Sequence, residues 1–224
     1  MIKIGENLNA IKLTIPEHVQ LVAVSKTKPV EYIQAAYDAG QRVFGENKAQ
    51  EMNAKHSQLP SDIQWHFIGH LQTNKVKYIA PFASLIHGVE SLKLLKEINK
   101  QGAKNERIID CLLQFYIAEE ETKFGLDYEE ASELLCSEAF VQMKNIRIVG
   151  VMGMATYTED QDQIKHEFSK LKSIADQLKV EFFASSDDFK EVSMGMSGDY
   201  ELAIEQGSTM VRIGSAIFGE RNYL

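Results

Sequence analysis

The sequence predicts an α/β protein that folds as a TIM (β/α)8 barrel, a single domain of residues 1–224 with an extra N-terminal helix. About eight short apolar segments alternate with helix-like segments, as in parallel βαβ units. The apolar segments are nearly continuous, as expected for strands buried on both faces. The length of 224 residues lies within the roughly 200–250 residues of a one-domain α/β barrel. An open doubly wound sheet is the alternative, because the alternation does not determine whether the sheet closes.

The first elements follow from apolar spacing and from proline. Ile4, Leu8 and Ile11 recur at helical spacing and predict an amphipathic helix over residues 2–14. Residues 21–25 are uncharged and apolar, and Pro29 cannot donate to a sheet ladder, so a strand is expected to end between them.

The same criteria, with glycine or proline at segment ends, assign the rest of the chain. The further expected strands are residues 42–47, 63–70, 84–89, 107–118, 146–154, 191–196 and 209–213. The expected helices are residues 30–39, 48–59, 72–80, 91–101, 129–140, 164–178 and 200–206. Residues 180–190 have no clear pattern.

The composition excludes several classes of protein. The net charge of −8 provides no basic excess for nucleic acid or for an anionic membrane. No apolar stretch approaches the length of a membrane span, and residues 1–10 do not resemble a signal peptide. Cys111 and Cys136 are the only cysteines, and both are expected to be reduced core residues. We therefore expect a cytoplasmic protein.

Lys26 is the first candidate for chemistry. It lies where the strand of residues 21–25 ends, and the carboxyl ends of strands are where ligands bind in parallel α/β folds. A lysine amine near apolar walls loses its proton more easily and can attack an aldehyde. A solvated lysine without a function is the simpler interpretation of this residue alone.

Two glycine-containing segments after the last two expected strands predict a phosphate site. Gly195 and Ser197 lie at the end of one strand and just beyond it, and Gly214 and Ser215 follow the other. In TIM barrels these two loops frequently bind phosphate through backbone N–H groups. Arg212 adds a permanent positive charge that could face a phosphate or a ring nitrogen.

Other features argue against this phosphate site or compete with it. The glycines could be simple tight turns and Arg212 a surface ion-pair partner. Asp199 and Glu201, just after Ser197, would compete with a phosphate for the same donors. Asn47 is another strand-end residue that could touch a ligand held by Lys26, or could cap the following helix.

Metal and nucleotide sites are not predicted. His66 and His70 would lie about 13 Å apart on one strand, too far for a single ion. The chain has no H-E-x-x-H or C-x-x-C motif, no P-loop and no G-x-G-x-x-G after a strand.

Several of these segments together resemble one family, the pyridoxal phosphate homeostasis proteins (YggS/PROSC type). The similar segments span nearly the whole chain: residues 21–29 (LVAVSKTKP), 44–47 (FGEN), 65–72 (WHFIGHLQ), 193–197 (SMGMS) and 207–219 (GSTMVRIGSAIFG). Lys48 departs from the tyrosine that members often have after FGEN, and residues 114–117 replace a stretch that usually contains asparagine.

The resemblance implies a barrel like the N-terminal domain of alanine racemase, with pyridoxal 5′-phosphate (PLP) bound as a Schiff base. Lys26 would form the Schiff base, Asn47 would lie on the ring side, and Arg212 would lie near the cofactor. The phosphate would be held by Ser197, Gly214, Ser215 and the backbone of Met196. An arginine near the pyridine nitrogen would leave that nitrogen unprotonated and make a poorer electron sink.

The leading hypothesis is a PLP-binding protein, without established catalysis, that buffers or delivers PLP in vitamin B6 homeostasis. Apo-enzymes that use PLP would receive it, and the protein would be a monomer. The chain ends soon after its last expected strand, so we expect it to lack the second domain and second base of a racemase. The alternatives are a small PLP-dependent racemase or lyase, and an aldolase-like barrel that uses Lys26 without a cofactor.

Overall fold

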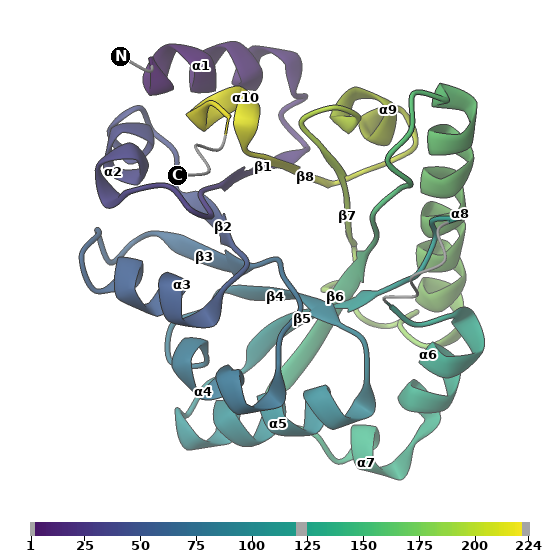
Figure 1. Ribbon diagram of the computed structural model, residues 1–224. Helices are drawn as coiled ribbons and strands as arrows, with labels where there is room; N and C mark the ends of the chain where they lie inside the picture. The colour runs from purple at the N-terminus through teal and green to yellow at the C-terminus, as the bar shows by residue number, and fades with distance from the viewer. Residues whose placement is uncertain (1–2, 120–124, 221–224) are drawn as a thin grey trace.

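The computed structural model describes residues 3–119 and 125–220, and its eight parallel strands close into a barrel in chain order (Figure 1). Each strand pairs with its neighbour, and β1 pairs with β8. The predicted TIM barrel is therefore confirmed, and the open sheet is excluded. The strands are β1 (Gln20–Val24), β2 (Val43–Glu46), β3 (Gln64–Phe67), β4 (Leu85–Val89), β5 (Ile109–Gln114), β6 (Ile146–Met152), β7 (Glu191–Met196) and β8 (Met210–Ile213).

Helices form a ring around the barrel (Figure 1). They are α1 (Ile4–Thr14), α2 (Val30–Asp38), α3 (Ala49–His56), the 3-10 helix η1 (Thr73–Lys75), α4 (Val76–Ile79), α5 (Leu92–Lys104), α6 (Tyr128–Cys136), α7 (Glu138–Val141), α8 (Gln161–Glu181), α9 (Tyr200–Glu205) and α10 (Ser215–Phe218). The extra N-terminal helix α1 is confirmed. It packs beside α10, where the Asn7 side chain donates to the Ile217 carbonyl at 3.1 Å.

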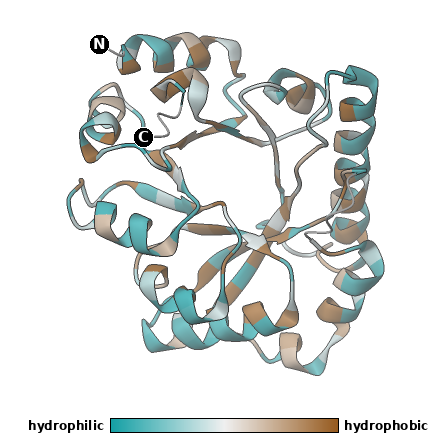
Figure 2. Ribbon diagram, in the orientation of Figure 1, coloured by the Kyte–Doolittle hydropathy of each residue, from teal (hydrophilic) through white to brown (hydrophobic). Residues whose placement is uncertain are grey.

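The apolar side chains form two layers, one on each side of the sheet. Leu21 and Ala23 of β1 belong to a large cluster that includes helix residues such as Ile33 and Phe168. Val22, between them, belongs to a smaller cluster that contains only strand residues and therefore fills the barrel interior. In Figure 2 the strands are largely hydrophobic, whereas the helices carry both hydrophobic and hydrophilic residues. This burial on both faces explains why the strand segments are continuously apolar.

The structure differs from the predicted elements in a few places. The helix expected at residues 129–140 is interrupted at Ser137, whose extended backbone and side-chain oxygen cap α7 through the Phe140 N–H. Cys136, at the end of α6, is exposed, so the prediction that it is a core residue is wrong, whereas Cys111 is buried. Residues 182–190, beyond α8, form turns in which the rings of Phe183 and Phe189 stack. The short helix α10 was not predicted.

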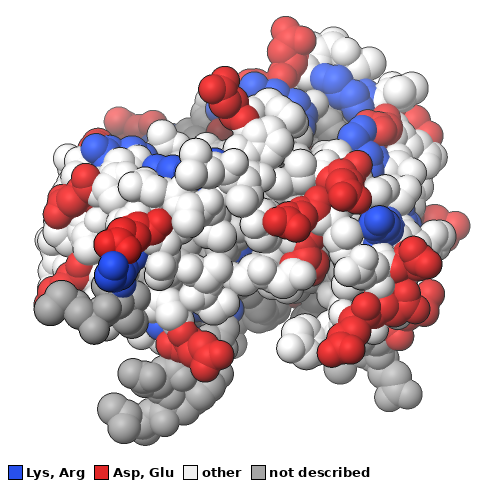
Figure 3. All heavy atoms as spheres, turned by 90° about the horizontal axis from the view of Figure 1, so that it is seen from above, with Lys and Arg blue, Asp and Glu red and all other residues white. Residues whose placement is uncertain are grey.

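Among the described residues, no helix is both long enough and apolar enough to cross a membrane. On the face of the molecule that Figure 3 shows, acidic and basic side chains of the described residues are interspersed.

Gly195 provides a test of how tightly the end of β7 packs. Its φ of +94° is rare for other residues, and an added Cβ would lie 2.6 Å from the Ala203 Cβ. We expect Gly195→Ala to lower the free energy of unfolding by about 2 kcal/mol, from strain and overlap together. The matched control is Gly198→Ala, because nothing lies within 4 Å of a Cβ there. Urea unfolding should show a change of at most about 0.5 kcal/mol for the control; equal losses in both variants would contradict the prediction.

Candidate functional site

A cavity of about 630 Å³ lies at the carboxyl ends of the strands. Residues that follow β1, β3, β6, β7 and β8 form its walls, and the size suits a small organic ligand. Six of the seven predicted site residues line this cavity: Lys26, Met196, Ser197, Arg212, Gly214 and Ser215. Barrel closure brings them together, because Lys26 is almost 190 positions away from Arg212 in the sequence.

Lys26 lies two residues beyond the end of β1 and is half-buried at the rim of the cavity. The ladder continues to Ser25, whose N–H donates to the Gly45 carbonyl at 3.0 Å, so the chain is still ordered just before Lys26. Lys28 also lines the cavity, but its amine donates to the carbonyls of Gly219 and Glu220 at 2.9 and 2.8 Å. The Lys28 amine is therefore directed to the main chain that follows α10.

The loops after β7 and β8 meet at one wall of the cavity. The Gly214 N–H donates to the Ser197 hydroxyl oxygen at 3.2 Å and links the two loops. A Cβ on Gly214 would lie 3.1 Å from the Val24 carbonyl oxygen, so glycine permits the close approach of β8 to β1. Ser215 begins α10 and is exposed. This wall presents the hydroxyls and backbone that an anion site requires.

Asp199 occupies the position at which the sequence predicted competition with an anion. Its carboxylate accepts a hydrogen bond from the Met196 N–H at 2.5 Å. Burial raises the pKa of Asp199, while the Met196 N–H and the charge of Arg212 act in the opposite direction. The predicted contact of a phosphate with the Met196 backbone therefore requires this carboxylate to give up the N–H, or requires the phosphate to bind a neighbouring group.

Arg212 is the buried charge of the site. It is 4% exposed, and it donates to the Ser193 hydroxyl at 2.6 Å and to the Gly153 carbonyl at 3.0 Å. Burial lowers the pKa of Arg212 to about 10, which still leaves it charged at neutral pH. No ion pair to Arg212 occurs among residues 3–119 and 125–220. Arg212 is therefore not a surface ion-pair partner, and its charge favours an anionic or electron-rich ligand in the cavity.

Two histidines continue the contacts of Arg212 across the barrel interior. His87 Nδ1 lies 3.0 Å from the Ser193 hydroxyl oxygen, and His87 Nε2 lies 3.0 Å from His66 Nδ1. Burial lowers the pKa of His66 to about 3 and lowers that of His87 well below its ordinary value, so both rings are neutral. A neutral imidazole has one donor nitrogen and one acceptor nitrogen. The Ser193 hydroxyl can therefore donate to His87 Nδ1, and His87 Nε2 can donate to His66 Nδ1.

This chain of hydrogen bonds was not predicted from the sequence, where the histidines were considered only as metal ligands. The available signal was that His66 and His87 are polar residues within largely apolar, buried strands. Neither residue forms part of a metal cluster, since no group of three or more suitable ligands exists in the described parts of the chain.

Asn47 lies outside the lining of the main cavity. It lines a second hollow of about 150 Å³ with Lys48, His70 and Lys75. Its side-chain oxygen is buried and has no hydrogen-bond partner, and its Cβ packs against Gly69. A role for Asn47 beside a ligand of the main cavity stays a prediction.

The neutral histidines predict a pH dependence of stability. The unfolded chain binds a proton at His66 and at His87 below about pH 6.5, whereas the folded barrel keeps both rings neutral, so stability falls as the pH falls from 6.5 towards 3. For His66 this loss is about 2 kcal/mol at pH 5 relative to neutral pH. We expect His66→Asn to remove this part of the difference in the free energy of unfolding between pH 7.5 and pH 5.

Urea unfolding at the two pH values measures this effect. His18→Asn is the matched control, because His18 is exposed. Equal pH dependence in wild type and His66→Asn would show that His66 is not held neutral by the fold.

Comparisons with known proteins agree on the family of this chain. A family model described as the alanine racemase N-terminal domain matches residues 2–222. The pyridoxal phosphate homeostasis protein of Aquifex aeolicus is 40% identical over 205 residues, which cover 91% of this chain and 88% of that protein. The protein of the same name in Escherichia coli K12 is 37% identical over 215 residues, 93% of this chain and 88% of that one.

Solved structures show the same likeness. The PLP-bound structure of PipY from Synechococcus elongatus superposes with a TM-score of 0.87 at 32% identity, and the match covers 97% of this chain and all of PipY. Alanine racemase from Bartonella henselae gives a TM-score of 0.73 at 16% identity, which shows a shared fold alone. That match covers 97% of this chain but 58% of the racemase.

Proposed function

The chain belongs to the pyridoxal phosphate homeostasis proteins, within the family of alanine racemase N-terminal domains, and from this premise we propose that it binds PLP in the cavity at the carboxyl end of its barrel. The observation that supports this proposal best is the meeting of Lys26, Arg212 and the loop of Gly214 in one cavity. The PLP-bound state of PipY, a protein of the same length class and fold, is consistent with it.

The described residues suit the three polar parts of PLP. Lys26 brings an amine for the aldehyde, and Ser197, Gly214 and Ser215 form the wall that suits the phosphate. Arg212 brings a buried positive charge whose contacts to Ser193 and Gly153 hold its guanidinium in one orientation. Lys26, Lys28 and Arg212 outnumber Asp199 in the lining, so the cavity attracts an anion.

We propose further that Lys26 holds PLP as a Schiff base. When bound, PLP supplies an aldehyde that condenses with amines and a ring that withdraws electrons. Lys26 would hold the aldehyde by condensation of its amine with the aldehyde carbon, and the two amine hydrogens would leave with the aldehyde oxygen as water. Ile68 and Val24 provide apolar parts of the wall of the same cavity.

The role in the cell that we propose is buffering of PLP, or delivery of PLP to apo-enzymes, in the cytoplasm. In the position near the pyridine nitrogen that the family resemblance implies, Arg212 would support a carrier more than a catalyst, because a permanent cation there disfavours protonation of that nitrogen. Turnover of an amino acid, abolished by Lys26→Ala, would favour the racemase or lyase alternative instead.

The first test is the visible spectrum of the purified protein with PLP, before and after borohydride. We expect a yellow chromophore that is lost on reduction, and a pyridoxyl adduct that mass spectrometry places on Lys26. Lys26→Ala should form no adduct in the cavity, whereas Lys93→Ala, which alters an exposed lysine of α5, should behave as wild type. An adduct on Lys28 would contradict the assignment, and a colourless wild-type protein that takes up no PLP would contradict the proposed function.

The phosphate wall predicts a ligand-dependent effect of Ser197. Its hydroxyl already bridges to the Gly214 N–H, so it lies where it can reach a phosphate oxygen. We expect Ser197→Ala to weaken PLP binding about ten-fold, the value of one hydrogen bond to a charged group. Pyridoxal, which lacks the phosphate, should bind both proteins equally in equilibrium titrations. Equal weakening for both ligands would place Ser197 away from the phosphate.

A further inference from the structure

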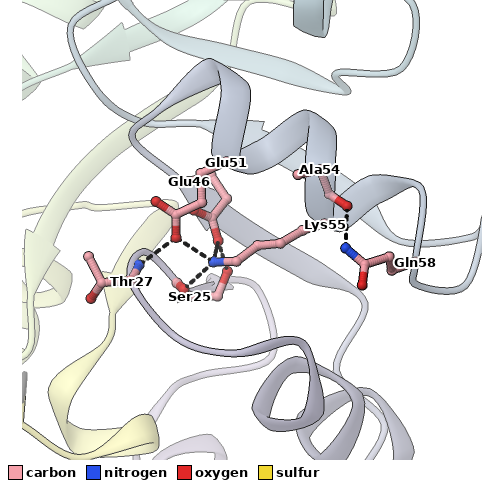
Figure 4. Close-up of polar contacts among 7 residues, drawn as sticks. All are labelled: Ser25, Thr27, Glu46, Glu51, Ala54, Lys55 and Gln58. Carbon is pink, nitrogen blue, oxygen red and sulfur yellow. Dashed lines mark hydrogen bonds and ion pairs between the residues drawn. The ribbon is translucent and has the colours of Figure 1, made fainter.

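The main chain on both sides of Lys26 is held by side chains from α3. The Ser25 carbonyl, just before Lys26, accepts a hydrogen bond from Lys55 Nζ at 2.9 Å. The Thr27 N–H, just after Lys26, donates to Glu51 Oε1 at 2.7 Å. Figure 4 shows these contacts converging from α3 onto the end of β1. Lys26 therefore leaves the barrel rim from a segment that is fixed at both ends.

The two holding residues are joined to each other and to Glu46. Lys55 Nζ lies 2.7 Å from both Glu46 Oε1 and Glu51 Oε1, and the Ser25 hydroxyl donates to Glu46 Oε1 at 2.6 Å. The three acceptors of Lys55 match the three donors of an ammonium group. We call Ser25, Thr27, Glu46, Glu51 and Lys55 the Lys55 cluster.

The Lys55 cluster is buried, and this burial restricts the positions that its charged groups can take. The side chains of Lys55 and Glu46 are 7% and 0% exposed, and a lysine is almost never buried this far unless it is paired. The burial that desolvates Glu46 raises its pKa, although Lys55 acts against this shift. Loss of either partner would leave a buried charge, so the ammonium stays in one position relative to the end of β1.

Thr27 gives independent evidence that this segment is held in a special conformation. Its φ is +64°, a left-handed value that is rare for a β-branched residue. Such strain persists only where surrounding contacts determine the backbone, and it gathers at functional sites. The contact that fixes the Thr27 N–H is the one from Glu51.

We propose that Glu51 and Lys55 are positioning residues for Lys26, an inference that rests on the proposed binding of PLP. They hold the backbone so that the Lys26 amine meets the aldehyde carbon from one direction, and the new carbon–nitrogen bond then forms with loss of water. They do not touch the ligand, because neither residue lines the cavity. Misplacement of a reacting amine by about 1 Å is sufficient to slow its reaction by up to about a hundred-fold.

The test compares a ligand that reacts with Lys26 and one that does not. PLP and pyridoxine 5′-phosphate share the ring and the phosphate, but pyridoxine 5′-phosphate has an alcohol in place of the aldehyde. We expect Glu51→Ala to slow the formation of the PLP chromophore in stopped-flow measurements at least about ten-fold. Its dissociation constant for pyridoxine 5′-phosphate should equal that of wild type.

Three further variants separate a positioning role from an effect on general stability. Glu51→Gln keeps an oxygen that accepts from the Thr27 N–H, so it should restore most of the rate. Asn53→Ala alters an exposed residue of the same helix and is the matched control. If Glu51→Ala does not fold, Glu51→Asp provides a milder change that keeps the charge and shortens the reach.

The outcomes are distinct. A slower reaction with unchanged affinity for pyridoxine 5′-phosphate, restored by Glu51→Gln, supports the positioning role. An unchanged rate, or equal losses for both ligands, overturns it and leaves the Lys55 cluster as support for the fold. If wild type binds neither ligand, the proposed function fails and the positioning role fails with it.

Discussion

The pairing of β1 with β8 is the constraint on which the site depends. In this register Val22 lies opposite Arg212 and Ala23 lies opposite Ile213, so the two strands end side by side. Lys26 therefore leaves the rim next to Gly214 and Ser215, although the sequence separates them by nearly the whole chain. In an open sheet β1 and β8 would not meet in this way, and Lys26 would not face the loop after β8. The small size of Gly214 lets the backbones approach at this seam.

The charge of Arg212 is buried in the barrel interior and requires hydrogen-bond acceptors there. A buried guanidinium needs hydrogen-bond acceptors, and here a hydroxyl and a carbonyl supply them. The Asp199 carboxylate acts on the guanidinium through its charge, without an ion-pair contact. The next two groups, His87 and His66, are themselves neutral, so they orient Ser193 without adding charge. The positive charge of Arg212 is consequently directed at the cavity and is not cancelled inside the barrel. Apolar packing alone would not give this result, because an apolar interior offers no acceptor.

The sequence was sufficient to predict the strands, because each is an apolar segment buried on both faces, and their number and the chain length favoured a barrel. Residue patterns at the strand ends pointed to five residues that line the cavity, Lys26, Ser197, Arg212, Gly214 and Ser215, and the family resemblance added Met196. The sequence was insufficient where two distant segments must be brought into contact. His66 and His87 lie on different strands, and only the register of β3 with β4 brings their rings together. The break at Ser137 depends on a local cap that competes with a helical pattern. Asn47 follows a strand as predicted. Its side chain packs against Gly69 and lines the second hollow, and the sequence pattern did not indicate this side of the loop.

Lys26 and Lys55 are residues of the same type, but their surroundings give them different roles. In the sequence both are lysines near the end of an expected strand or helix, and nothing local distinguishes their chemistry. In the structure Lys55 directs its amine to Ser25, Glu46 and Glu51, which engage all three of its hydrogen-bond donors away from the cavity. Lys26 instead extends from the segment that Lys55 holds, at the edge of a cavity with apolar walls. A charged lysine that fixes the backbone of a reactive lysine thus links the stability of the β1 end to the chemistry of the cavity.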